Sequence, residues 1–124
     1  MRRLFTLIYN LIFPKQLTTS YSSNSNVSST AFNRIRAWHV GGIVIVDMNL
    51  QVTTSLATGG GAVTIGQINL PRNGYYSYAN MQSQNKSGNL LITIQSDGTV
   101  TIQNASGSAI TGFHRGTMVI VLGG

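Results

Sequence analysis

The sequence contains no cysteine, and this absence removes several classes of protein. Without thiols the chain has no disulfide framework, no thiolate zinc site and no cysteine nucleophile. At 124 residues it is nevertheless long enough to bury a hydrophobic core without covalent links. The length therefore predicts a single domain that is stabilised by its core.

Acidic side chains are almost as scarce, since the chain has two of them, Asp47 and Asp97, and no glutamate. Catalysis by paired carboxylates needs two such groups close together, but Asp47 lies in a strand pattern and Asp97 in a turn. The two histidines, His39 and His114, also lie in different segments, so neither a metal site nor a catalytic triad is supported. We therefore expect a protein that is not an enzyme and binds no cofactor or metal.

Basic residues are more frequent, and the formal net charge of +6 suggests nucleic acid as a partner. Phosphate binding needs these residues in a cluster, however. Here the eight Lys and Arg residues are divided between the first fifteen positions and scattered positions along the rest of the chain. A basic, barrel-type nucleic-acid binder thus remains a minor alternative. Solubility must come from Ser, Thr, Asn, Gln and Gly, a composition typical of extracellular and virion β-proteins.

No apolar run reaches the roughly 20 residues that a membrane-spanning helix needs, so no membrane span is expected. The first thirteen residues, MRRLFTLIYNLIF, form the most distinct apolar segment. Their apolar side chains recur at helical spacing until Pro14, which predicts a short helical or extended anchor within residues 1–15. The candidate docking residues are Leu4, Phe5, Leu7, Ile8, Leu11 and Ile12.

Three interpretations of this segment remain open. It could dock into a partner protein or pair with copies of itself, it could be a signal or membrane-surface segment, or it could be an ordinary core element. We favour docking, because Tyr9 and Asn10 interrupt the apolar run and no small-residue cleavage site follows.

The segment 16–30 is nearly all small and polar. It carries too little apolar surface to pack, so it predicts an extended polar linker. An edge strand along the body of the protein is the alternative. The strand patterns all fall within residues 31–124, which we expect to form the folded domain.

The clearest strand pattern runs from Gly88 to Asn104. Apolar and polar residues alternate on both sides of Asp97 and Gly98, a pair that favours a tight turn. This arrangement predicts a β-hairpin and assigns Asp97 to its turn rather than to a site.

Two further segments show the same alternation. Residues 43–53 predict a long strand with one apolar and one polar row, and Asp47 belongs to the polar row as a solvated or arginine-paired charge. In the next apolar segment the alternation changes phase at Gly66 and Gln67, which predicts a β-bulge or a bend.

The last strand, expected from Gly116 to Leu122, is apolar on both rows. Such a strand is either covered on both faces within one chain or covered on one face by another subunit. Together with the short turns between them, these segments predict an all-β fold: an antiparallel, jelly-roll-like β-sandwich.

Three stretches of this domain are informative when taken together. They are INLPRNGY from Ile68 to Tyr75, ITIQSDGTVTIQNASGS from Ile92 to Ser108, and the apolar strand that ends the chain. In this order they resemble the C-terminal β-sandwich (head) domains of bacteriophage tail-fibre, baseplate and receptor-binding proteins. The resemblance covers residues 31–124. The turn in this chain carries one residue more than the family's Leu-Pro-any-Gly-Tyr turn, and Tyr76-Ser77 replaces the arginine-proline that often follows it.

The resemblance implies a homotrimeric module on a phage particle, with the sandwiches packed about an axis and loops available for host saccharides or proteins. It also implies a location on the virion, at the capsid surface, collar or tail. Such modules usually end long fibres, whereas Met1 precedes this domain by about 30 residues. We therefore expect a short head fibre, a decoration protein or a tail appendage.

The candidate subunit interface consists of Val119, Val121 and Trp38. The two valines belong to the second apolar row of the last strand, which is unusual for a solvent-facing row. Trp38 is the only tryptophan and supplies the bulk expected of a core or interface anchor.

The candidate ligand-binding residues are Tyr75, Tyr76, Tyr78, His114 and Arg115. Saccharide sites combine aromatic faces with amide and hydroxyl groups, and Asn80 lies further along the tyrosine strand. Tyr76 and Tyr78 are expected on one face and Tyr75 on the other, so the three cannot serve one site. His114 and Arg115 are expected in a loop, where they could contact an acidic sugar or a neighbouring chain.

The function that these features favour is that of a non-enzymatic phage virion protein. It would be docked through its N-terminus and would present a trimeric β-sandwich that can bind host-surface glycans or proteins. The alternative is a secreted carbohydrate-binding module with an N-terminal signal segment.

Overall fold

The structure, a computed structural model, describes residues 14–22, 33–56, 61–83, 90–105 and 109–123. Within these residues the fold is all-β, as predicted, and contains no helix. The nine strands are β1 (Lys15–Leu17), β2 (Thr19–Tyr21), β3 (Arg34–Val40), β4 (Ile43–Leu56), β5 (Val63–Ile68), β6 (Ser77–Ser83), β7 (Leu90–Ile94), β8 (Thr99–Asn104) and β9 (Ile110–Val121).

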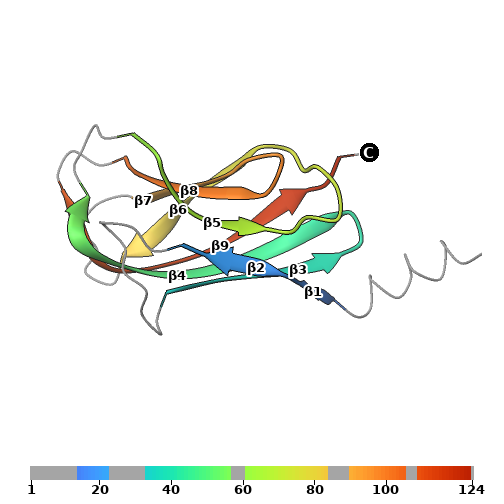
Figure 1. Ribbon diagram of the computed structural model, residues 1–124, viewed down its shortest axis with the longest axis horizontal. Helices are drawn as coiled ribbons and strands as arrows, with labels where there is room; N and C mark the ends of the chain where they lie inside the picture. The colour runs from blue at the N-terminus through green and yellow to red at the C-terminus, as the bar shows by residue number, and fades with distance from the viewer. Residues whose placement is uncertain (1–13, 23–32, 57–60, 84–89, 106–108, 124) are drawn as a thin grey trace, which may run out of the picture.

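The strands form two antiparallel sheets that pack face to face (Figure 1). One sheet, called sheet A here, has the order β1-β3-β4-β9 and ends at one part of β6, and the other, sheet B, has the order β6-β7-β8-β5-β2. The strand β6 belongs to both, because its Gln82 and Ser83 pair with β9 while the residues from Ser77 to Met81 pair with β7. This is the β-sandwich that the alternating patterns predict.

The N-terminal strands join the sheets at the opposite edge. β1 pairs with β3 of sheet A, and after a single residue, Thr18, β2 pairs with β5 of sheet B. The hydroxyl of Thr19 also donates a hydrogen bond to the carbonyl oxygen of Ile35 at 2.6 Å. The chain thus crosses from one sheet to the other at this edge, with β1 and β2 as the two end strands of the order.

This position corrects the expected domain boundaries. The polar linker was predicted over 16–30 and the folded domain from residue 31, but Lys15 to Tyr21 form paired strands and belong to the domain. The edge-strand alternative is therefore right for this stretch. Most of its side chains are polar, but Leu17 and Tyr21 pack against the core. The rest of the stretch is held by backbone pairing, which an edge strand can use without a continuous apolar face. The remainder of the predicted linker, 23–32, and the predicted anchor up to residue 13 lie outside the described residues.

The hydrophobic core lies between the sheets. Apolar side chains from alternate positions of β4, β7, β8 and β9 meet there, as expected for strands with one buried face. The largest fully buried apolar side chains are Met48, Leu50, Ile65, Ile68, Leu90, Ile92, Ile94, Ile102, Ile110 and Ile120.

The predicted hairpin between Gly88 and Asn104 is confirmed as β7 and β8. Gly98 has a φ of 93°, and its amide donates to the Gln95 carbonyl at 2.9 Å. The Asp97 carboxylate accepts a hydrogen bond from the Thr99 amide at 3.0 Å. This bond lowers the pKa of Asp97 below its ordinary value. Asp97 therefore acts within its turn, as its sequence context predicts.

The predicted bulge is also confirmed, one residue earlier than expected. The pairing of β5 with β8 shifts register between Thr64 and Gly66. A side chain at Gly66 would place its Cβ 2.2 Å from the carbonyl oxygen of Ser20 in β2. Glycine is required here because the backbone of β2 passes directly over it.

The last strand is longer than predicted, because β9 begins at Ile110 rather than at Gly116. His114 and Arg115 were expected in a loop and this expectation is wrong. The two flanking glycines, Gly112 and Gly116, suggest a loop locally, but residues 112–121 of β9 pair continuously with β4. Backbone pairing with a long partner strand outweighs the local preference.

Candidate functional site

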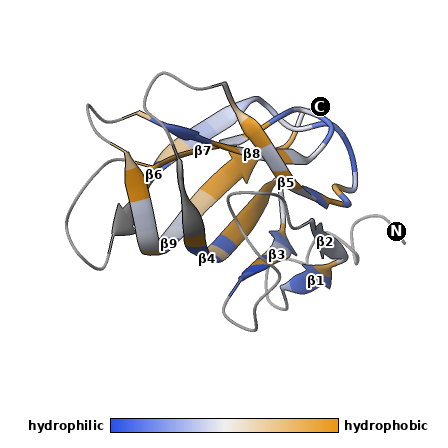
Figure 2. Cartoon of the chain, turned by 60° about the vertical axis from the view of Figure 1, so that its left-hand side comes forward, coloured by the Kyte–Doolittle hydropathy of each residue, from blue (hydrophilic) through white to orange (hydrophobic). Residues whose placement is uncertain are grey.

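The outward-facing side of sheet A carries an unusual group of apolar side chains. In one row across the sheet Val40 lies opposite Ile43, which lies opposite Val121. In the next row Trp38 lies opposite Ile45, which lies opposite Val119. We call these six residues the apolar face. Figure 2 shows the hydrophobic colour running along this part of β4 and β9.

The apolar face is accessible in the single chain. Val119 is 50% exposed and Val121 is 51% exposed, while the other members are half-buried. A hollow of about 440 Å³ beside it is lined by Pro14, Trp38 and Ile45. Pro14, which lies near the end of the predicted anchor segment, is thus next to the apolar face.

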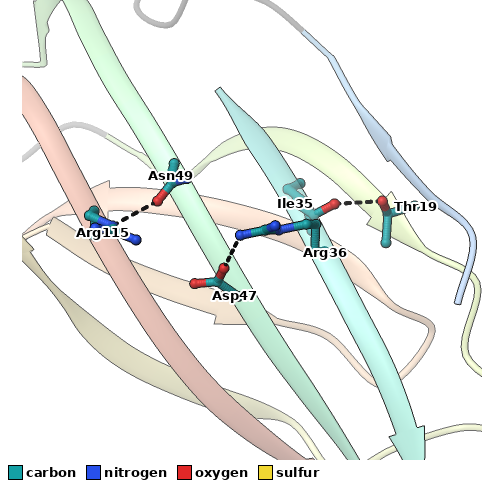
Figure 3. Close-up of polar contacts among 6 residues, drawn as sticks. All are labelled: Thr19, Ile35, Arg36, Asp47, Asn49 and Arg115. Atoms are coloured by element: carbon teal, nitrogen blue, oxygen red, sulfur yellow. Dashed lines mark hydrogen bonds and ion pairs between the residues drawn. The ribbon is translucent and has the colours of Figure 1, made fainter. Parts of the chain in front are cut away.

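The next two rows of the same side of the sheet are polar. Arg36 lies opposite Asp47, and its Nη2 is 2.6 Å from the carboxylate Oδ2 (Figure 3). The guanidinium of Arg36 also lies 5.7 Å from the centre of the Trp38 ring, which links the polar rows to the apolar face through a cation–π contact. The arginine pairing expected for Asp47 is confirmed.

In the second polar row Arg115 lies opposite Asn49. The Nε of Arg115 donates to Oδ1 of Asn49 at 3.1 Å (Figure 3). Asn49 is only 3% exposed, so its amide is held by its surroundings and in turn orients the guanidinium. Arg115 is thus an exposed cation with a defined position.

A groove lies where β9 and β6 separate. Within the described chain the two strands pair at Arg115 and His114, and the next link between these regions is the bridge from Gly74 to Leu122. Between these points a groove of about 430 Å³ is lined by Asp47, Asn80, Arg115, Gly116 and Thr117.

Two of the predicted ligand-binding tyrosines precede Asn80 in the chain, and Tyr78 lies on the same strand, β6. Tyr76 and Tyr78 are 61% and 70% exposed, and their ring centres are 6.5 Å apart in a tilted arrangement. They lie together, as the alternation predicts. Tyr75 is also exposed, and its amide donates to the carbonyl of Val121 at 2.8 Å, which places its backbone at the end of β9.

His114 does not lie with these residues. Its side chain is completely buried on the inner side of β9, with Nε2 3.3 Å from the carbonyl oxygen of Thr111. Among the described residues its Nδ1 has no hydrogen-bond partner. Burial lowers the pKa of His114 below its ordinary value. This burial argues against His114 as a ligand-binding residue, because alternation along the strand directs its side chain inward and that of its neighbour Arg115 outward.

The structure therefore brings together some predicted residues and separates others. Trp38, Val119 and Val121 share the apolar face, and Arg115 shares a groove with Asn80. Sequence reasoning missed that Asp47 lines this groove too. Its position on the polar row of β4 indicates that Asp47 faces outward. Which strand lies next to it could not be predicted, because β4 pairs with β9, more than sixty residues later in the chain.

No group of three or more histidine or acidic residues that could hold a metal ion occurs in the part of the chain that the structure describes. The described residues also include no helix with the length and apolar character needed to cross a membrane. The six docking residues predicted between Leu4 and Ile12 lie outside the described residues. Comparison with models of protein families, with curated proteins and with solved structures gave no match.

Proposed function

We propose that this protein is a non-enzymatic attachment protein, of the kind that forms short appendages on phage particles. In this proposal copies of the β-sandwich associate through the apolar face, as a trimer, and the N-terminal segment docks into another virion protein. The association presents the rest of each sandwich to a host surface.

The observation that carries the proposal is the apolar face itself. Exposed apolar side chains that adjoin one another across neighbouring strands mark interaction surfaces in soluble proteins. The inner row of β9 already fills the core of its own chain, so Val119 and Val121 have no role in that core. Their apolar character is explained if another copy covers them.

The charges on the same side of sheet A favour contact at one end only. Arg34, Arg36 and Arg115 lie in the polar rows, and Asp47 is the only acidic residue there. Two copies laid fully face to face would bring these like charges together, which is unfavourable. A cyclic assembly that buries the apolar rows near the axis and leaves the basic rows outside avoids this repulsion.

The position of Pro14 supports a common anchor. Because Pro14 adjoins Trp38 and Ile45, the N-terminal segments of associated copies would leave the assembly from the same end. Their apolar residues would then meet a docking partner together, and several weak contacts would act at a high effective concentration.

The test is the mass of the assembly in solution, measured by light scattering over a range of protein concentrations. The wild-type chain is expected to be an oligomer, and Val119→Lys is expected to be a folded monomer because a charge would have to be buried at each contact. Thr111→Lys is the matched control, since Thr111 is exposed on the same side of β9 but outside the apolar face. A wild-type monomer, or a Val119→Lys oligomer, would contradict the proposal.

The proposed anchor makes a separate prediction. The intact mass of the protein isolated from its natural source is expected to include the residues that precede Pro14. A mature protein from which these residues have been removed would contradict docking and favour a secreted carbohydrate-binding module.

A further inference from the structure

The groove between β9 and β6 has a chemical character distinct from that of the apolar face. Its side chains come from three strands: Asp47 from β4, Asn80 from β6, and Arg115 and Thr117 from β9. They provide a carboxylate, an amide, a guanidinium and a hydroxyl group. A ligand in this groove could therefore both donate hydrogen bonds to these side chains and accept hydrogen bonds from them.

The two charged groups are held in place before any ligand arrives. One carboxylate oxygen of Asp47 is bound by Arg36 at 2.6 Å, and the other points to the β9 side of β4 (Figure 3). The Nε of Arg115 is bound by the buried Asn49 at 3.1 Å, and this is the one hydrogen bond of its guanidinium within the described residues. Because these side chains are already ordered, binding a ligand would cost less conformational entropy.

The charge balance of the groove selects among ligands. Asp47 and Arg115 are the two charged side chains that line the groove. Asp47 is ion-paired with Arg36, and Arg115 forms no ion pair within the described residues. Asp47 repels any anion that Arg115 binds, but a phosphate monoester, with a charge of about −1.5 to −2, is repelled more strongly than a singly charged carboxylate. A carboxylate still forms the two parallel hydrogen bonds that a planar guanidinium offers, so it is the anion that the charges of the groove favour.

Asp47 and Asn80 indicate the rest of the ligand. A carboxylate accepts hydrogen bonds from hydroxyl groups, and an amide both donates and accepts them. Groups of these kinds in one groove suit a ring that carries several hydroxyls. Asn80 also shares one side of β6 with Tyr78, two residues away, and the ring of Tyr76 lies 6.5 Å from that of Tyr78.

We propose that this groove binds a saccharide that carries a carboxylate. Arg115 binds the carboxylate, Asp47 and Asn80 bind ring hydroxyls, and a neighbouring sugar ring lies against Tyr78 and Tyr76. Aromatic side chains present flat apolar surfaces to which the C–H faces of sugar rings can pack. This ligand class rests on the attachment function proposed above, since it names what the assembly would bind on a host surface.

The test uses the full chain on an array of immobilised oligosaccharides that carry hexuronic or sialic acids, with neutral counterparts of each. The wild-type protein is expected to bind at least one carboxylate-bearing glycan and to bind its neutral counterpart less. Arg115→Gln is expected to weaken this binding about tenfold to hundredfold, because it removes a charged hydrogen-bonding group. Tyr78→Ala is expected to weaken it about three- to tenfold.

Two substitutions serve as matched controls. Arg72→Gln removes an exposed arginine outside the groove, and Tyr75→Ala removes an exposed tyrosine that does not belong to the Tyr76–Tyr78 pair. Both are expected to leave binding unchanged. Thermal unfolding of every variant separates a loss of binding from a loss of folding.

The outcomes distinguish the groove from the assembly. An oligomer that binds no acidic glycan, or that binds equally after Arg115→Gln, overturns the saccharide site and leaves the apolar face as proposed. A monomer that binds an acidic glycan through Arg115 overturns the assembly and leaves the site. Equal binding of acidic and neutral glycans overturns the role of the carboxylate.

Discussion

The two sides of β9 differ in what they contact, although they belong to the same strand. On the inner side Met118, Ile120 and Leu122 pack in the core, with at most 7% of each residue exposed. On the outer side Val119 and Val121 are half exposed. Both sides are apolar, so hydrophobicity alone does not distinguish a core position from a contact position. What distinguishes them is the covering layer: the inner row packs against sheet B, whereas the outer row adjoins only its neighbours in sheet A and is half exposed within the described residues.

A similar contrast holds for charged and polar groups on β9. Arg115 faces outward and is bound by Asn49, whereas His114 faces inward, where its Nδ1 has no hydrogen-bond partner in the part of the chain that the structure describes. A polar group buried without a partner destabilises a fold, and an exposed one does not. The inner side is thus where substitutions should change stability, and the outer side is where they should change association and binding.

The largest expected effect tests this division directly. Ile120→Ala should lower the free energy of unfolding by about 2–5 kcal/mol, because it leaves a cavity in a packed core. The neighbouring change Val119→Ala should alter it by about 0.5 kcal/mol or less when association is absent. Urea denaturation at low protein concentration measures both. Equal effects for the two variants would show that the outer row also belongs to the core of a single chain.

A smaller effect is expected from the buried histidine. Since burial lowers the pKa of His114, the unfolded state binds a proton more readily than the folded state. The free energy of unfolding should therefore be constant above the ordinary imidazole pKa of about 6.5 and should fall as the pH drops below it. His114→Leu should flatten this dependence between pH 7 and pH 5, measured by urea denaturation.

The second histidine provides the control for that experiment. His39 is half-buried, with Nε2 2.8 Å from the carbonyl oxygen of Gly41. His39→Gln should leave the fall in stability below pH 6.5 in place. If the fall vanished in this variant and persisted in His114→Leu, the assignment to the inner side of β9 would be incorrect.

The smallest effect is expected for the outer ion pair. The side chains of Arg36 and Asp47 are 37% and 24% exposed, so solvent screens their attraction. Asp47→Asn should lower the free energy of unfolding by about 1 kcal/mol or less, and less in high salt. A double-mutant cycle with Arg36→Gln isolates the pair. A coupling of several kcal/mol would mean that this side of the sheet contributes to folding as strongly as the core.

Several features could be predicted from the sequence because they depend on neighbouring residues. Alternation gave the strand around Asp47 and the two apolar rows of the last strand, and the chemistry of Asp97 and Gly98 gave the hairpin turn. Alternation also placed Tyr76 and Tyr78 together. These features are determined over a few residues, where the geometry of a strand or a turn leaves little choice.

Other features were decided only by the tertiary structure. Lys15 to Tyr21 become strands because β3 and β5 offer unpaired backbone groups, which a polar sequence does not reveal. His114 turns inward because β9 pairs with β4 through the segment that appeared to be a loop. Asp47, Asn80 and Arg115 meet because β4, β6 and β9 are brought side by side, although they lie far apart in the chain.

The sequence by itself thus determined the class of fold, its main turns and the apolar rows of its strands, because each follows from local periodicity. The tertiary structure decided which apolar row lies in the core, which lies on the apolar face, and which polar residues share a groove. The physical reason is that these outcomes depend on strand order and register, which are set by the packing of the whole core rather than by any one segment.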